Sequence, residues 1–324
     1  MKAFERLNAI ADVRRAWPAA GNSIVFETLD EYQRIRAGKI DADGTVTINA
    51  YASDGQLPTV AGATGDIVVH RLGRRAVEMR SRSVRKHLRA SKVASAFGAA
   101  QLASRAARRC GLYVPPVIAV GQTYIDFEMR PGISLAGADC PESAWEAFYA
   151  TWPGFAASTV DAATHDGADE ARVLATWLDH VRTHNTMEAI TDIAANAQRV
   201  AAVLTRTGDH LVTAHRDLHE KQMLWDGRHL TLLDGDTIAR SEAALDLGNL
   251  AAHLELAATS GHIPTSTVNH RLGKLRDLAH TMHVSESRLE AYTQAARLRT
   301  ACVHSFRPTS MPWISHWIDH CLAH

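Results

Sequence analysis

The sequence predicts an α+β protein with two parts, a small antiparallel-sheet part over about residues 1–130 and a larger helical part over about 131–324. Short β-branched runs between turn residues characterise the first part, and apolar spacings of three and four characterise the second. The change falls at Arg130-Pro131-Gly132, where proline and glycine end the strand pattern. A chain of 324 residues is long enough for each part to bury a core.

The first 60 residues carry a weak pattern. They open with a short helix-like segment, and the turn residues Asp41–Gly44 precede an alternating strand pattern over Thr45–Ile48. We assign no chemistry to this region.

An antiparallel sheet and one helix are predicted from residue 66 onward. Ser91 is the expected N-cap of an Ala-rich helix, Lys92–Arg109, which ends before Gly111. The predicted strands on either side of this helix are Ile67–Leu72, Ala76–Met79, Ser83–Leu88, Val117–Val120 and Thr123–Met129.

For the second part, the sequence predicts helices interrupted by one hairpin. Apolar residues recur at helical spacing, as in Val173, Trp177 and Val181. The expected helices cover residues 142–152, 168–183, 187–206, 243–258, 266–283, 285–301 and 311–322.

The hairpin joins two apolar runs, Met223–Trp225 and Leu230–Leu233, through the turn pair Asp226-Gly227. A loop before it carries His215, Asp217, His219 and Gln222, and the second run ends on Asp234. Folding the second run back beside the first should bring Asp234 next to this loop, which suggests a site.

Charge is balanced overall, with 35 basic and 35 acidic residues, so it gives no argument for binding nucleic acid or membranes. The distribution is uneven, because Arg71–Lys92 holds nine bases and one acid, whereas Pro131–Ile190 holds nine acids and two bases. Two solvated faces would explain this, as would a site with an anion-binding wall and a cation-accepting wall.

The cysteines and the hydropathy favour a soluble, cytoplasmic protein. The 4 cysteines are widely spaced without a Cys-x-x-Cys pair, which argues against structural zinc and a disulfide scaffold. The chain shows no N-terminal signal pattern, and no apolar run approaches the ~18 residues of a transmembrane helix.

The polar stretch resembles a known family. His215-Arg216-Asp217-Leu218-His219, followed by Gln222 and a strand ending in Asp234, is similar to the aminoglycoside phosphotransferase branch of the protein-kinase-like fold. The usual form there is His-Gly-Asp-Leu-His-x-x-Asn followed by an Ile-Asp strand, and Ala244–Leu247 resembles the segment after it. The order of elements is similar over residues 66–258, but only 215–246 carries specific motifs.

This resemblance implies roles for the carboxylates. Asp217 would act as catalytic base or orient the acceptor hydroxyl, and Asp234 would hold Mg²⁺. Gln222 replaces the usual Asn and could also bind the metal through its amide oxygen. The alternatives are a loop Asp that caps its own backbone, a strand-ending Asp in a turn, and a Gln that braces the loop. Asp236 could contact a second ion or face solvent.

The resemblance also implies a nucleotide site. Lys86 would neutralise the phosphates, but its usual partner, a helix glutamate, is missing because Lys92–Arg109 contains no acid. Gln101 stands at about the expected spacing; alternatively, the strand register is wrong. Backbone groups of a hinge would bind the adenine edge, and the residues that match this hinge are Glu128, Met129 and Arg130.

Two further residues would support the loop. His215 is expected to be a buried brace, and Asp246 resembles a structural acid, with a helix N-terminal carboxylate as the rival interpretation.

We therefore predict a kinase that uses ATP or GTP with Mg²⁺ to phosphorylate a hydroxyl of a small molecule, with no oligomeric state assigned. The acids of residues 131–190 suggest a cationic acceptor, such as an aminoglycoside, amino sugar or amino alcohol. The alternatives are a nucleotide-binding pseudokinase and, with less support, a metallohydrolase that uses His215, Asp217 and His219.

Overall fold

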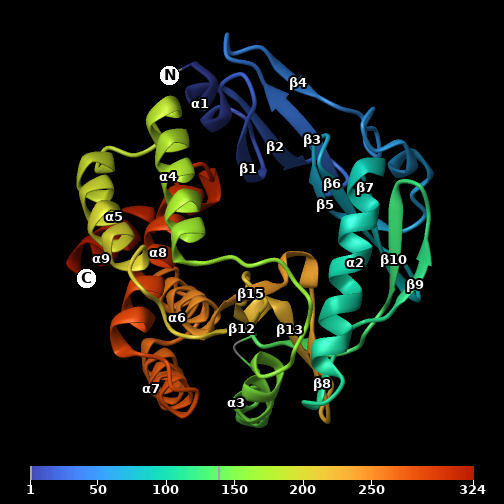
Figure 1. The fold of residues 1–324 in the computed structure, drawn as a ribbon. Helices are drawn as coiled ribbons and strands as arrows, with labels where there is room; N and C mark the ends of the chain where they lie inside the picture. Colours follow the sequence, from blue (N-terminus) through green and yellow to red (C-terminus); the bar gives the residue numbers. More distant parts are fainter. Residues whose placement is uncertain (1, 138) are drawn as a thin grey trace.

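The computed structural model describes residues 2–137 and 139–324, which are strand-rich in the first part of the chain and helical in the second (Figure 1). The strands form a four-stranded sheet, a five-stranded sheet and two smaller sheets. The predicted fold class, an antiparallel-sheet N-terminal lobe followed by a larger helical lobe, is confirmed.

The N-terminal sheet follows helix α1 (Lys2–Asn8) and contains four antiparallel strands paired in chain order. Ala19 pairs with Ser23, so a three-residue loop links the first two strands, and Gly21 and Asn22 in this loop have positive φ of 67° and 54°. The strand predicted at Thr45–Ile48 is confirmed, but the other three were not predicted. The bounds are β1 Val13–Ala19, β2 Ser23–Leu29, β3 Ile35–Ile40 and β4 Val46–Ile48.

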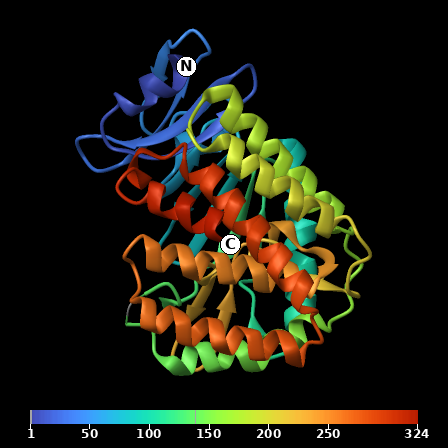
Figure 2. The ribbon, with the colours of Figure 1, turned by 90° about the vertical axis from the view of Figure 1, so that its left-hand side faces the viewer.

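This sheet packs on helices of the C-terminal part, above which it lies in Figure 2. Phe26 of β2 shares one hydrophobic core with Leu178 of α4 (Gly167–His184) and with Phe306. The N-terminal sheet therefore connects the two parts of the chain. A domain boundary at residue 130 stays a prediction.

The five-stranded sheet confirms all five strands predicted between residues 66 and 129. Its order is β5-β6-β7-β10-β9, and all of its pairs are antiparallel. The bounds are β5 Asp66–Arg71, β6 Arg75–Met79, β7 Ser83–Leu88, β9 Val117–Val120 and β10 Tyr124–Glu128.

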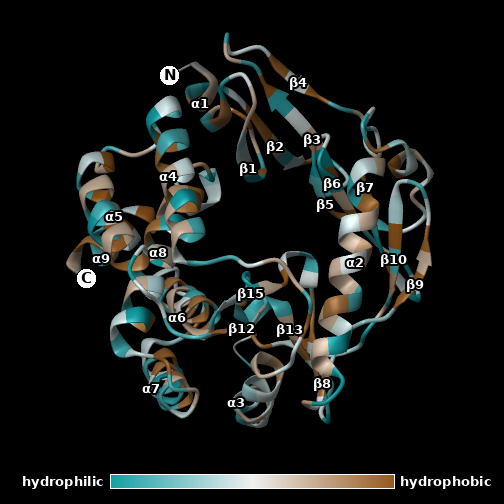
Figure 3. Cartoon of the chain, in the orientation of Figure 1, coloured by the Kyte–Doolittle hydropathy of each residue, from teal (hydrophilic) through white to brown (hydrophobic). Residues whose placement is uncertain are grey.

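Helix α2 (Ala90–Ala107) packs beside this sheet, with Val93 in contact with the cluster of Leu88 and Ile125. The predicted cap is wrong, because the helix begins after Arg89 and makes no side-chain capping bond there. Figure 3 colours α2 mostly white and brown, since its Ala-rich sequence contains no acidic residue.

The predicted hairpin forms at β13 (Met223–Trp225) and β14 (Leu230–Leu232). It is flanked by β11 (Ile133–Ser134) and, in parallel, by β8 (Leu112–Tyr113). A separate antiparallel pair joins β12 (Leu211–Ala214) to β15 (Ala239–Glu242).

All seven predicted C-terminal helices are confirmed. Their second core, under the hairpin, is built on the large aromatic side chains Trp145, Phe148, Trp152 and Phe155. Among the described residues, none of the helices has the length and apolarity that a membrane crossing requires. Besides α4, the bounds are α3 Glu142–Ala156, α5 Ile190–Leu204, α6 Ala243–Thr259, α7 Thr265–Thr281, α8 Glu286–His304 and α9 Ile314–Ala323.

Candidate active site

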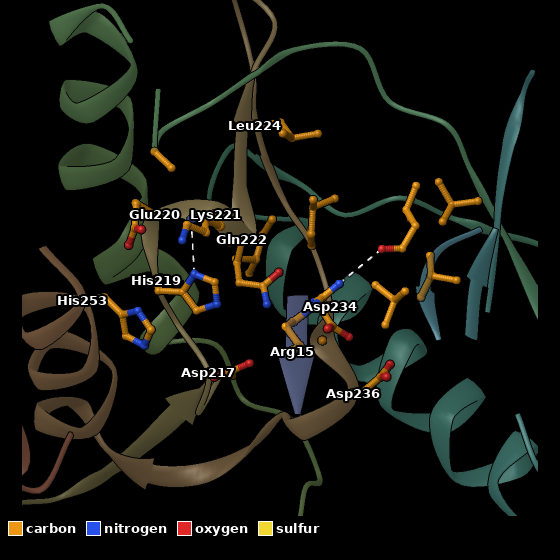
Figure 4. A pocket seen from close by; sticks show the side chains of 18 of the residues that line it. Arg15, Asp217, His219, Glu220, Lys221, Gln222, Leu224, Asp234, Asp236 and His253 are labelled. Carbon is orange, nitrogen blue, oxygen red and sulfur yellow. Dashed lines mark hydrogen bonds between the residues drawn. The ribbon is translucent and has the colours of Figure 1, made fainter. Parts of the chain in front are cut away.

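A cavity of about 910 Å³ lies between the two sheets of the N-terminal part and the C-terminal helices. Figure 4 shows Asp217, Gln222, Asp234 and Asp236 at this cavity. Lys86 of β7 and the hinge residues 128–130 also line it. The structure thus brings together the residues predicted for catalysis, metal binding and nucleotide binding.

The loop that carries Asp217 is fixed from below by Asp246, at the start of α6. The two carboxylate oxygens of Asp246 accept hydrogen bonds from the backbone N–H groups of His215 and Arg216, both at 2.7 Å. Asp246 is almost completely buried, and this burial raises the pKa of its carboxyl to about 6. The predicted support by Asp246 therefore has a specific geometry, a carboxylate that holds two consecutive amides.

His215 links the same loop to the end of β14. Its Nε2 donates to the backbone oxygen of Leu233 at 2.8 Å, while Thr237 Oγ1 donates to its backbone oxygen at 2.8 Å. His215 is fully buried and does not line the cavity, and His219 groups with Glu220 and His253 rather than with His215 and Asp217, which lowers the support for a zinc site on these three residues.

Arg216 adopts φ of +70°, a left-handed conformation that glycine adopts most easily. In the family pattern this position is glycine. The left-handed residue turns the chain between the two amides bound by Asp246 and Asp217. The Arg216 side chain donates to the backbone oxygen of Thr237 at 3.4 Å.

The hairpin register places Gln222 beside Asp234. The backbone N–H of Leu233 donates to the backbone oxygen of Gln222 at 2.8 Å, so the two strand ends stay adjacent. Carboxylate and amide oxygens are suitable ligands for Mg²⁺. Asp234, Asp236 and Gln222 supply such oxygens at one side of the cavity.

Lys86 binds both of these carboxylates. Its Nζ lies 2.5 Å from Asp234 Oδ1 and 2.9 Å from Asp236 Oδ2. Burial alone would lower the pKa of Lys86, but the two carboxylates raise it above its usual value. Burial opposes ionisation of Asp234 as well, yet Lys86 and Arg75 hold its pKa below the usual range, whereas burial raises the pKa of Asp236.

The predicted pairing of Lys86 with Gln101 is wrong. Gln101 is exposed on α2, and Asp234 and Asp236 take the place of a helix carboxylate. Helix α2 approaches closely enough that a Cβ at Gly235 would stand 2.6 Å from Ala103 Cβ. Small residues on both sides therefore let α2 contact the segment that carries the two carboxylates.

Two of the three backbone N–H groups in the predicted hinge, residues 128–130, are already hydrogen-bonded within the protein. The N–H of Glu128 donates to Pro116 O at 3.0 Å, and that of Met129 donates to Arg82 O at 3.1 Å. These two amides are therefore already used. Within the described part of the chain, the N–H of Arg130 is the hinge amide without such a bond. The side chains of Arg130 and Glu128 are also paired, at 3.1 Å.

The other end of the cavity combines His219 of the predicted loop with residues that no sequence motif identified. His219 stacks on His253 of α6 at 4.6 Å between ring centroids, and Glu220 lies beside them (Figure 4). Burial lowers the pKa of His219 to about 4, and that of His253 is also well below its usual value. Among the described residues, these three are the group whose donor atoms lie close enough together for a transition metal.

The acid-rich segment 131–190 does not form a wall of this cavity. Of its described residues, Ala136 is the one that lines the cavity. The wall is instead basic, with Arg15 of β1, Lys221, and Arg299 and Arg307 from α8 and the turn after it. The expectation of a cationic acceptor therefore loses its basis.

These basic residues escaped prediction because they meet only through tertiary packing. Arg15 lies on a strand that was not predicted, although the turn pair Gly21-Asn22 before the strand-like run Ile24–Phe26 is a signal that could have indicated a hairpin here. Arg299 and Arg307 carry no local signal that separates them from other arginines.

The chain matches no protein-family model and no curated protein. Solved structures do match its fold. A choline/ethanolamine kinase family protein from Mesorhizobium loti superposes with a TM-score of 0.55 at 15% identity, covering 82% of this chain and 90% of that one. A macrolide 2'-phosphotransferase type I gives 0.53 at 17% identity, covering 81% and 91%.

The aminoglycoside phosphotransferase APH(3'')-Id from Streptomyces rimosus gives a TM-score of 0.54 at 15% identity, covering 76% of this chain and 96% of that one. Identities this low establish a common fold. The chain therefore has the two-lobed protein-kinase-like fold of small-molecule kinases, as its motif around Asp217 predicted.

Proposed function

We propose that this protein is a small-molecule kinase that transfers the γ-phosphoryl group of ATP or GTP to a hydroxyl of its acceptor. One observation carries the proposal: Asp217, Gln222 and Asp234 line a single cavity on a kinase-like fold together with Lys86, which lies 148 residues before Asp234 in the sequence. Phosphoryl transfer depends mainly on positioning and charge neutralisation, and these residues supply both.

The nucleotide would bind between the five-stranded sheet and the hairpin. Val77, Met79 and Leu232 line that side and offer apolar contacts to a purine ring, and the N–H of Arg130, which forms no other backbone bond among the described residues, would donate to its edge. The phosphates would then extend toward Lys86, whose Nζ already lies between two carboxylates.

The donor set fits Mg²⁺. Asp234, with Gln222 and Asp236, would hold the ion, because each presents a hard oxygen ligand on the same side of the cavity. The contact of Lys86 with both carboxylates supports this assignment, since it marks a place where positive charge is required. When bound, Mg²⁺ would neutralise phosphate charge.

Asp217 would accept the proton of the acceptor hydroxyl or orient it toward the γ-phosphate. Its loop is held by Asp246 through two amides and by His215 through Leu233. A carboxylate on a loop fixed in this way can be aimed at an acceptor without moving, which supports a catalytic role.

The test compares Asp217→Asn with wild type, using labelled ATP and GTP and a panel of hydroxyl compounds. The variant should lower kcat by roughly 10²–10⁴-fold with little change in nucleotide affinity. Asp277→Asn, at an exposed position on α7, is the matched control and should have wild-type activity. Near-normal phosphorylation by the Asp217 variant would remove Asp217 from the mechanism.

A pseudokinase is the second candidate. It is favoured by the absence of an acid from α2 and by the direct closure of Lys86 on Asp234 and Asp236. A pseudokinase would bind nucleotide but phosphorylate none of the acceptors, so the same panel of hydroxyl compounds separates a pseudokinase from a kinase. Metal analysis of the purified protein covers the metallohydrolase alternative, which requires tightly held zinc.

A further inference from the structure

The acceptor end of the cavity carries an excess of positive charge. Arg15, Lys221, Arg299 and Arg307 line it together with four histidines, His219, His253, His262 and His304. The acids at this end are Asp217, which the proposed mechanism uses for the hydroxyl, and Glu220, which is almost completely buried. Because Glu27 pairs with Arg15 and Glu170 lies near Arg299, Lys221 and Arg307 are the two cations of this end that form no ion pair among the described residues.

Arg307 is the least compensated of these cations. It contacts the neutral partner His304, whose Nε2 lies 3.3 Å from Arg307 Nη1, and its Nε is buried without a hydrogen-bond partner. No carboxylate among the described residues forms an ion pair with it. Burial lowers the pKa of Arg307 to about 10; the nearby cation Arg15 also lowers it, and the carboxylate of Glu27 only partly opposes this.

The neighbouring cations are only partly satisfied. Arg299 hydrogen-bonds to Asn249 and lies 3.6 Å from Glu170, a distance that leaves part of its guanidinium free. The Lys221 side chain is exposed to the cavity. Arg15 is bound to the buried Glu27, which fixes it on β1 beside Arg307.

The phosphates of the nucleotide do not account for this charge, because their end of the cavity has cations of its own. Lys86 lies 2.5 Å and Arg75 3.7 Å from Asp234. Asp217 separates that end from His219 and His253, as Figure 4 shows. Lys221 and Arg299 lie near His219, whose pKa both of them lower, so these cations belong to the side from which the acceptor hydroxyl must approach. Arg15, which Figure 4 labels near Asp234 and which also acts on Arg307, lies between the two ends.

We infer that the acceptor is an anionic hydroxyl compound, whose carboxylate, phosphate or sulfate group is bound by Arg307 and Lys221 with support from Arg299 and Arg15. The inference rests on the proposed kinase function and names its substrate class. A guanidinium presents a planar fork that matches the oxygens of these anions, and a buried cation gains most from such a partner.

The experiment measures phosphorylation of matched acceptors that share one polyhydroxy carbon chain. One set contains the carboxylate, its amide and the corresponding amine; another contains the phosphate ester, the sulfate ester and the free polyol. We expect each anionic compound to have a higher kcat/KM than the neutral or cationic members of its set. The anionic compound with the highest kcat/KM identifies the group that the site prefers.

Variants then locate the anion. Arg307→Gln and Lys221→Gln should each lower kcat/KM for the anionic acceptor by roughly 10- to 100-fold and leave the neutral member unchanged. Lys221 is exposed, so its variant does not disturb folding. Arg276→Gln, at an exposed position on α7 outside the cavity, is the matched control.

The outcomes are distinct. Preference for the amine or for neutral members, or equal loss of all acceptors in the two variants, overturns the inference but leaves the kinase function intact. Transfer to no member, with Asp217→Asn indistinguishable from wild type, overturns the kinase function and the inference with it.

Discussion

The two ends of the cavity differ in how their charges are satisfied. At the nucleotide end, Lys86 is paired with Asp234 and Asp236, and Arg130 with Glu128. At the acceptor end, Arg307 has no carboxylate partner among the described residues. An end whose charged side chains are already paired suits a ligand that brings its own counter-ion, such as a nucleotide with Mg²⁺. An end with an unpaired cation suits a ligand with a net negative charge.

The two ends also differ in origin. The nucleotide and metal end is built largely from one stretch, residues 215–236, together with β7 and the hinge. The acceptor end combines β1, α6, α8 and the turn after α8. Substitutions at the nucleotide end are therefore expected to change activity by the same factor for every acceptor. Substitutions at the acceptor end are expected to have effects that depend on the acceptor.

Among the variants that compare the two ends, the largest effect is expected for Asp234→Asn. Loss of this carboxylate removes the main Mg²⁺ ligand and half of the partner set of Lys86, so kcat should fall by roughly 10²–10³-fold for all acceptors alike. Turnover measured against Mg²⁺ concentration checks this, and a higher Mg²⁺ requirement should accompany the loss. A loss confined to anionic acceptors would break the distinction between the two ends.

Asp236→Asn is the matched variant at the nucleotide end. Asp236 shares Lys86 with Asp234, but its contact with Lys86 Nζ is longer, 2.9 Å against 2.5 Å, and burial raises the pKa of its carboxyl. Its replacement should therefore cost less than that of Asp234. Equal losses would assign the two carboxylates equal shares of the metal.

A pH effect should follow from Asp246, which holds the loop between the two ends. Its pKa is raised to about 6, so acidification through pH 6 protonates it and weakens its bonds to the amides of His215 and Arg216. We expect kcat to fall several-fold below pH 6, with a similar apparent pKa for every acceptor.

The sign for stability is the opposite. A carboxyl group with a raised folded-state pKa stabilises the fold below its unfolded pKa, near 3.8, and this contribution is lost as the pH rises through about 6. Thermal unfolding between pH 4 and 6 should therefore show no destabilisation from this group while activity declines. Asp246→Asn should abolish this limb of the pH–rate profile, and a limb that persists would assign the titration elsewhere.

The sequence predicts the nucleotide end well because local chemistry encodes it. The turn pair Asp226-Gly227 sets the hairpin, and the hairpin sets the distance between Gln222 and Asp234. The spacing of His215, Asp217 and Asp246 likewise follows from one loop and one helix start. The roles of these residues remain proposals, but their convergence follows from short-range rules.

Long-range pairing explains what the sequence does not reveal. The partner of Lys86 was expected on α2, at Gln101, because that helix follows in the chain; the carboxylates that bind it lie about 150 residues later, at Asp234 and Asp236. The same applies to Arg15 and Arg307, which share a wall although they lie at opposite ends of the chain. A pattern within 20 residues cannot specify such contacts.

A smaller effect is expected for Gly235→Ala, which tests the contact between α2 and the metal-binding segment. The added Cβ would meet Ala103 Cβ at 2.6 Å, so one of the two segments must shift. Overpacking of this kind costs typically 1–3 kcal/mol, and we expect a lower unfolding temperature and weaker nucleotide binding. Ala103→Gly in the same chain should restore both. Failure of this rescue would place the strain outside this contact.

The smallest effect is expected for Arg216→Gly, because two backbone contributions oppose each other. Glycine relieves the left-handed strain at φ of +70°, worth roughly 1–2 kcal/mol, but it increases the conformational entropy of the unfolded chain by a similar free energy. The stability measured by denaturant unfolding should therefore change by less than about 1 kcal/mol. Activity should stay within about twofold for neutral and anionic acceptors alike, since the loop is held by Asp246 rather than by the Arg216 side chain.

Asn185→Gly supplies the matched reference, because Asn185 has φ of 50° at the end of α4, away from the cavity. If Arg216→Gly lost only the anionic acceptors, the Arg216 guanidinium would belong to the acceptor end, and the division between the two ends would have to be redrawn to include it.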